Sequence, residues 1–190
     1  MFYLYDGFGL FELIISGSMF AGKTQTLLAR LDVFKHAGKD VRLYCPVGSQ
    51  RYGAQNEVVT HSLIRAPAQE IETTDELVNL VKQIETPSSI VMGIDEVMLF
   101  DEERIVDNVN WLVNNGVIII ASGLTLYSEG QPFGHMPYLL SIADAITYLY
   151  GVCHSCGGPA TRSKAIFNKK EKKVVGADYI PLCRRCWQNQ

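Results

Sequence analysis

The sequence predicts an α/β fold in which a parallel sheet is flanked by helices and followed by a small metal-binding subdomain. Three observations predict it. Apolar runs alternate with helix-forming stretches up to residue 150, a phosphate-loop pattern follows the first apolar run, and two cysteine pairs follow residue 150. Because the composition changes at Gly151, we expect a nucleotide-binding α/β domain over residues 1–150 and a zinc-ribbon subdomain over residues 151–190.

The expected elements follow hydrophobic periodicity and helix end signals. Strands are expected at 12–16, 41–45, 89–94, 117–121 and 145–150, and helices at 23–37, 75–85, 101–115 and 137–143. Thr74 is a candidate N-cap, Gly38 and Gly116 are placed to end helices, and residues 47–61 are expected to form a loop. In a parallel sheet of this kind, ligands bind beyond the carboxyl ends of the strands.

Residues 17–24 match the phosphate-loop pattern G-x-x-x-x-G-K-[ST] at every fixed position. The backbone N–H groups of such a loop, and the N-terminus of the helix that follows, bind phosphate. Lys23 is expected to reach the β- and γ-phosphates, and the Thr24 hydroxyl to ligate Mg²⁺. The residues expected to bind ATP are Gly17, Ser18, Met19, Phe20, Ala21, Gly22, Lys23, Thr24 and Thr26. An ordinary glycine-rich turn is the alternative, and the strand before it and the helix after it argue against that.

An acidic pair, Asp95 and Glu96, follows the apolar run 90–94. A carboxylate at the end of a buried strand, opposite a phosphate loop, can hold Mg²⁺ directly or through water, and we expect Asp95 to do so. Glu96 is placed to act as a general base. The alternative is that both are solvated residues at a strand end.

Four cysteines, Cys153, Cys156, Cys183 and Cys186, form two Cys-x-x-Cys pairs. Four thiolates at this spacing suit a closed, structural Zn²⁺ site, and the alternatives are a redox dithiol or paired disulfides. Between the pairs, residues 161–167 and 173–175 are expected to form the arms of a hairpin. The fifth cysteine, Cys45, is expected to be a small buried apolar residue.

The composition is that of a globular protein, with 47% hydrophobic and 19% charged residues. The net charge of -3 gives no general attraction to nucleic acid or to an anionic membrane, and neither is an expected partner. No apolar run has the length of a membrane span, and the aromatic N-terminal segment lacks the basic region of a signal peptide. We therefore expect a cytoplasmic location.

Together these motifs resemble the type II thymidine kinase family, the zinc-containing cytosolic class, from about residue 11 to residue 187. The resemblance rests on separated motifs in the correct order. They are Met19-Phe20 in the phosphate loop, Arg51-Tyr52, Thr60-His61, Asp95-Glu96, Gly123-Leu124, Gly130, Pro132-Phe133-Gly134, Met136-Pro137, and residues 153–162, 176–179 and 183–186.

The resemblance implies transfer of phosphate from ATP, with Mg²⁺, to the 5′-hydroxyl of a deoxynucleoside, with thymidine the expected one, in a homotetramer. It implies that Glu96 takes the hydroxyl proton and that Arg51 approaches the phosphates together with Lys23. A loop after the ribbon, the lasso, covers the nucleoside in this family. The residues that this implies for the nucleoside pocket are Met19, Leu99, Leu124, Ser128, Val174, Gly176 and Tyr179.

Several positions depart from the family pattern on the nucleoside side. After the acidic pair, the family has a small residue, Gln and Phe, whereas this chain has Val97, Met98 and Leu99. Thr125 stands where the family has Asp, and Gln131 stands where it has Glu. Ser128 and Glu129 replace an aromatic residue and Arg. The losses of aromatic surface at Leu99 and Ser128 would weaken stacking on a base. A nucleotide-binding family member with weakened or altered kinase activity is therefore the second hypothesis.

A third hypothesis, from another class of protein, is a nucleic-acid-stimulated ATPase with a zinc ribbon. Arg184-Arg185 and the lysines of residues 169–173 motivate it. The net acidity of the chain argues against it.

Overall fold

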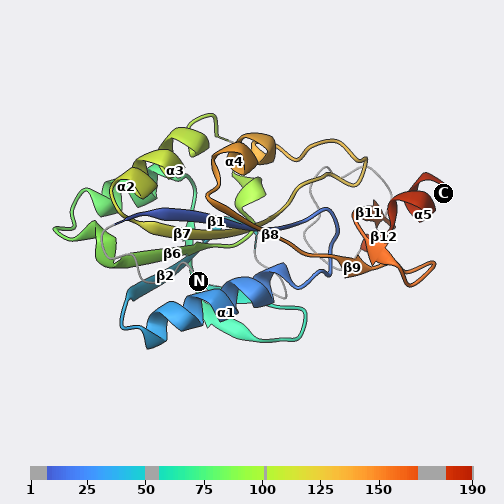
Figure 1. The fold of residues 1–190 in the computed structure, drawn as a ribbon, viewed down its shortest axis with the longest axis horizontal. Helices are drawn as coiled ribbons and strands as arrows, with labels where there is room; N and C mark the ends of the chain where they lie inside the picture. Colours follow the sequence, from blue (N-terminus) through green and yellow to red (C-terminus); the bar gives the residue numbers. More distant parts are fainter. Residues whose placement is uncertain (1–7, 50–55, 101, 167–178, 190) are drawn as a thin grey trace.

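The structure is a computed structural model, and it describes residues 8–49, 56–100, 102–166 and 179–189. A parallel sheet forms its centre (Figure 1). The strands lie in the order β5 (Gln69–Ile71), β2 (Asp40–Pro46), β6 (Ile90–Ile94), β7 (Ile118–Leu124), β1 (Leu10–Ser16) and β8 (Ala145–Tyr148). The predicted α/β class and parallel sheet are thus confirmed.

The central strands are apolar because helices cover both of their faces. Every residue of β6 and β7 is buried, and so is every residue of β1 after Leu10. β7 begins one residue later than predicted and runs on to Leu124, three residues beyond the expected end at Ala121. The small and polar residues Ser122 and Gly123 hid this extension from a reading based on β-branched residues.

The helices are divided between the two faces of the sheet (Figure 1). α1 (Lys23–His36) packs on one face, and α2 (Asp75–Val81), α3 (Ile105–Asn114) and α4 (Met136–Ile142) lie on the other. A Cβ on Gly93 of β6 would lie 2.4 Å from Leu31 Cδ1, so this glycine allows α1 to approach the sheet closely. In the part of the chain that the structure describes, no helix is long and apolar enough to cross a bilayer.

Two predicted helices are shorter in the structure, and Thr74 occupies the predicted N-cap position without a side-chain capping hydrogen bond. α2 ends at Val81 and α3 begins at Ile105, while residue 101 lies outside the described residues. The short 3-10 helices η1 (Pro87–Ser89) and η2 (Val97–Leu99) flank β6. The Thr74 hydroxyl does not cap α2, because it donates to Glu102 and accepts from Asn108 Nδ2 at 2.8 Å.

A hairpin lies within and just after the region predicted as a loop. β3 (Glu57–Val59) pairs antiparallel with β4 (Arg65–Pro67), so the prediction of a loop over residues 47–61 was wrong for residues 57–59. Three residues are too few for a periodic signal, and the pairing itself creates these strands.

The cysteine-bearing part of the chain consists of short elements at one end of the sheet (Figure 1). They are β9 (Gly151–Val152), β10 (Pro159–Ala160), β11 (Arg162–Ala165), β12 (Tyr179–Leu182) and α5 (Arg184–Gln188). β11 confirms the first predicted hairpin arm, and it pairs antiparallel with β12. The second predicted arm, residues 173–175, lies outside the described residues and stays a prediction. The division of the chain into two domains at residue 150 stays a prediction.

Candidate functional site: a phosphate loop, an acidic pair and a cysteine cluster

The phosphate loop connects β1 to α1 through two left-handed residues. Gly22 has φ 81°, and Phe20 has φ 60°, which a residue with a side chain rarely adopts. The backbone N–H and the hydroxyl of Thr26 both donate to Gly22 O at 3.0 Å. These bonds fix the point at which the loop becomes helix. The Thr26 hydroxyl thereby holds the loop itself.

The acidic pair lies beside the loop. Asp95, at the end of β6, accepts hydrogen bonds from Thr24 Oγ1 at 3.1 and 3.3 Å to its two carboxylate oxygens. The Ser122 hydroxyl, from the end of β7, also donates to Asp95 Oδ1. Asp95 is 5% exposed and Lys23 is 7% exposed, so the charges of this site are largely shielded from water.

Thr24 and Asp95 together fit a magnesium ion. A hydroxyl and a carboxylate in contact, at the carboxyl edge of a parallel sheet, are the oxygen ligands that Mg²⁺ takes in phosphate-loop proteins.

Sequence reasoning missed Ser122. A polar residue near the end of an otherwise apolar buried strand, one strand away from Asp95, was the signal that could have found it.

Glu96 is buried, with 6% of its surface exposed, and its φ of 52° is left-handed. It lines a small cavity together with Asp95, Cys45 and Ser49. Non-glycine residues in this backbone region cost free energy and cluster at functional sites. The turn thus places a second carboxyl group next to the predicted metal ligand. Arg51, the other residue expected near the phosphates, lies outside the described residues.

Four of the described residues of the predicted nucleoside pocket share one apolar cluster. Met19 and Leu124 are buried in it, and Leu99 and Tyr179 pack against it. Ser128 differs, because its carbonyl accepts a hydrogen bond from Trp187 Nε1 of α5 at 3.2 Å. Val174 and Gly176 lie outside the described residues.

Met98, one of the departures from the family pattern, contacts the predicted pocket through its sulfur. The backbone N–H of Leu124 donates to Met98 Sδ at 3.4 Å. A thioether is a weak acceptor, so this buried N–H has a weaker partner than an amide side chain would provide.

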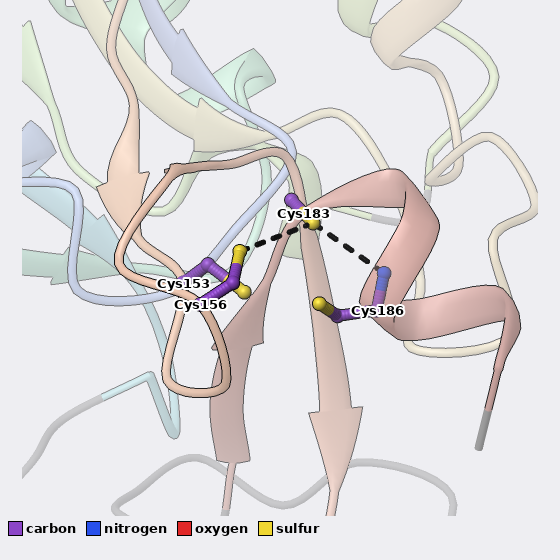
Figure 2. Close-up of side chains that lie close together, drawn as sticks. All are labelled: Cys153, Cys156, Cys183 and Cys186. Carbon is purple, nitrogen blue, oxygen red and sulfur yellow. Dashed lines mark hydrogen bonds between the residues drawn. The ribbon is translucent and has the colours of Figure 1, made fainter.

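Four cysteine sulfurs converge in the C-terminal subdomain (Figure 2). All four Sγ atoms lie within 4.8 Å of one another, and Cys156 and Cys183 are 3.8 Å apart. A backbone hydrogen bond at Cys183 is the main cause that lowers the pKa of the Cys153 thiol to about 6. Hydrogen bonding with Cys183 and Cys156 raises the pKa of the Cys186 thiol to about 12. Four thiol ligands at this separation fit a tetrahedral Zn²⁺ site and leave no ligand position for water.

The chain matches known proteins over nearly its whole length. The family model described as Thymidine kinase matches residues 9–187. A thymidine kinase of Bacteroides fragilis (strain YCH46) is 35% identical over 177 residues, which cover 92% of this chain and 85% of that protein. A thymidine kinase of Thermococcus kodakarensis is 40% identical over 163 residues, covering 85% of this chain and 82% of that protein. Since the match includes the phosphate loop, the acidic pair and the cysteine cluster, this chain belongs to the thymidine kinase family.

Proposed function

We propose that this chain transfers the γ-phosphoryl group of ATP to the 5′-hydroxyl of thymidine. The observation that carries the proposal is the contact between Thr24 of the phosphate loop and Asp95 of the acidic pair, with Glu96 beside them. The curated relatives named thymidine kinase support the choice of substrate.

On the phosphate side, the loop residues and Lys23 would bind the triphosphate. Thr24 and Asp95 would hold Mg²⁺, which when bound neutralises charge on the β- and γ-phosphates. Arg51 would add positive charge near the same phosphates. Because Lys23 and Asp95 are almost wholly buried, their electrostatic effect is stronger than it would be in bulk water.

On the acceptor side, Glu96 would act as the general base. The 5′-hydroxyl oxygen forms a bond to the γ-phosphorus as the bond from that phosphorus to the bridging oxygen breaks and ADP leaves. The hydroxyl proton passes to the Glu96 carboxylate. Phosphoryl transfer depends mainly on positioning and charge stabilisation, so the base adds to a rate that the phosphate loop already supports.

The nucleoside would bind against Met19, Leu99, Leu124 and Tyr179, together with Ser128, Val174 and Gly176. The cysteine cluster would hold a structural Zn²⁺, and the resemblance favours a homotetramer. Sedimentation velocity of the purified protein tests the assembly, and a monomer at assay concentrations would contradict it.

The first experiment supplies purified protein with ATP, Mg²⁺ and each common nucleoside, and measures formation of the 5′-monophosphate. Turnover on thymidine or deoxyuridine supports the proposal. Turnover only on another nucleoside would overturn the choice of substrate and direct attention to Leu99, Thr125 and Ser128. ATP binding without turnover on any nucleoside would favour a weakened family member. ATP hydrolysis stimulated by DNA or RNA would favour the ATPase alternative.

A further inference from the structure

The C-terminal subdomain forms hydrogen bonds with the phosphate loop at two consecutive residues. The backbone N–H of Met19 donates to Ser163 Oγ of β11 at 2.8 Å. The hydroxyl of Ser18 donates to the carbonyl oxygen of Ala160, at the end of β10, at 3.2 Å. These four residues are all buried, so neither bond competes with bulk water.

Thr161, which lies between β10 and β11, packs closely against the backbone of Gly17, the residue before Ser18. A Cβ on Gly17 would lie 2.2 Å from the carbonyl oxygen of Thr161, which leaves room only for glycine. The N–H of Thr161 in turn donates to Leu182 O at 3.0 Å, and the next residue is Cys183. One short chain of contacts therefore leads from the cysteine cluster to the phosphate loop.

The anchored residues adjoin the strained part of the loop. Phe20, with φ 60°, directly follows Met19. A strained backbone conformation of this kind persists only where its surroundings hold it in place. On one side the Ser163 bond holds Met19, and on the other the Thr26 bonds hold Gly22.

We propose that Ser163 is a positioning residue for the phosphate loop, and that through it the folded zinc subdomain sets the affinity of the chain for ATP. The inference rests on the proposed function in taking ATP as the ligand of the loop. Ser163 acts through the Met19 N–H and not by touching the phosphates. The zinc subdomain is therefore part of the ATP site as well as a support for the nucleoside side.

Replacement of Ser163 by Ala would leave the Met19 N–H buried without this acceptor, while the loop keeps its strained turn. We expect binding of a non-hydrolysable ATP analogue with Mg²⁺ to weaken about 5- to 30-fold, which is the lower part of the range expected when a buried donor loses its partner. Ser163→Thr keeps the hydroxyl group and should bind the analogue within about twofold of the parent chain.

The measurement is calorimetric titration of full-length protein with the analogue and Mg²⁺, without nucleoside, so that turnover is not needed. Ser155→Ala is the matched control, because it removes the same group from an exposed position between two of the cysteines. Zinc content and melting temperature are measured on each protein. Hydrogen exchange of residues 16–24 reports whether the loop itself loosens in the Ser163→Ala protein.

The proposal is supported if Ser163→Ala alone weakens binding and speeds exchange in the loop while zinc content stays full. It is overturned if folded, zinc-loaded Ser163→Ala protein binds the analogue like the parent chain. If that variant does not fold, Ser163→Cys gives the same test, because a thiol is a weak acceptor of similar size. A parent chain that binds the analogue but phosphorylates no nucleoside would refute the proposed function and leave this test intact.

Discussion

At the residue scale, Glu96 is the side chain that should act directly on the acceptor hydroxyl. It is buried, follows the buried strand β6, and lies in a left-handed turn beside Asp95. Gln has the same shape as Glu but cannot accept the proton from a hydroxyl group. We expect Glu96→Gln to lower kcat about 10²- to 10⁴-fold with little change in ATP-analogue binding. Steady-state kinetics and calorimetry check this, and an unchanged kcat would refute the assignment of the base.

Leu99 should limit the affinity for the nucleoside. It packs against the same apolar cluster that contains Met19 and Leu124, where the resemblance places the base. An aromatic ring stacked on a base contributes about 1–3 kcal/mol, so we expect Leu99→Phe to lower the KM for thymidine about tenfold. The KM for ATP should stay the same and serves as the internal control. A KM for thymidine that does not fall would place Leu99 outside the pocket.

The sequence predicted part of this site, because some of its contacts follow from topology alone. Asp95 and the phosphate loop both follow strands of one parallel sheet, so their ends had to share an edge. Ser163 could not be assigned in this way. It meets Met19 across 144 positions of sequence, and a serine in a short polar strand carries no pattern that reveals its partner. Trp187 and Ser128 pose the same problem.

At the element scale, two ionisable side chains of β2 should lower the folding stability of the chain as pH rises into the alkaline range. Burial raises the pKa of Tyr44 above its usual 10.0 and that of the neighbouring Cys45 thiol above its usual 9.0. Both side chains are neutral when protonated, so their stabilising contribution is complete below the unfolded pKa and is lost as pH rises through the folded pKa. We expect the urea concentration at the midpoint of unfolding to fall as pH rises from about 8 to about 10.5.

The matched variant for β2 is Tyr44→Phe combined with Cys45→Ala, which removes both ionisable groups. Its urea midpoint should start lower, because the core loses volume, but it should fall less steeply with pH. If the urea midpoints of the parent chain and the variant fall equally steeply with pH, groups other than Tyr44 and Cys45 control the alkaline transition.

The elements also show where prediction from sequence ends. The long strands follow continuous apolar runs, α1 follows a helix-forming segment directly after the phosphate loop, and the structure confirms them. β3, β4 and β12 are three or four residues long, and each exists because a partner strand lies beside it. Local preference cannot reveal a strand that only tertiary pairing creates.

At the scale of the whole molecule, the bound metal should hold the C-terminal subdomain together. Among the described residues of this subdomain, the apolar cluster has three buried members, Cys153, Ala160 and Leu182, and four partly buried side chains pack against them. A core of this size is too small to stabilise the subdomain alone. We expect Cys183→Ser to lose its zinc and melt several degrees or more below the parent chain, because structural zinc contributes directly to folding. Zinc content and differential scanning calorimetry measure this.

His154→Ala is the control for zinc loss, since His154 lies between two of the cysteines but is exposed and not among the four converging side chains. It should keep its zinc and its melting temperature. Full zinc content in Cys183→Ser, or loss of zinc without loss of stability, would contradict a structural role for the metal.

The position of β1 in the sheet has a consequence for how the chain is made. β1 pairs with β7 on one side and with β8 on the other, and both partners lie more than a hundred residues later in the sequence. A chain leaving the ribosome N-terminus first therefore exposes the apolar segment of β1 until most of the protein has been translated. Chaperones that shield β1 during translation should accordingly raise the yield of active enzyme.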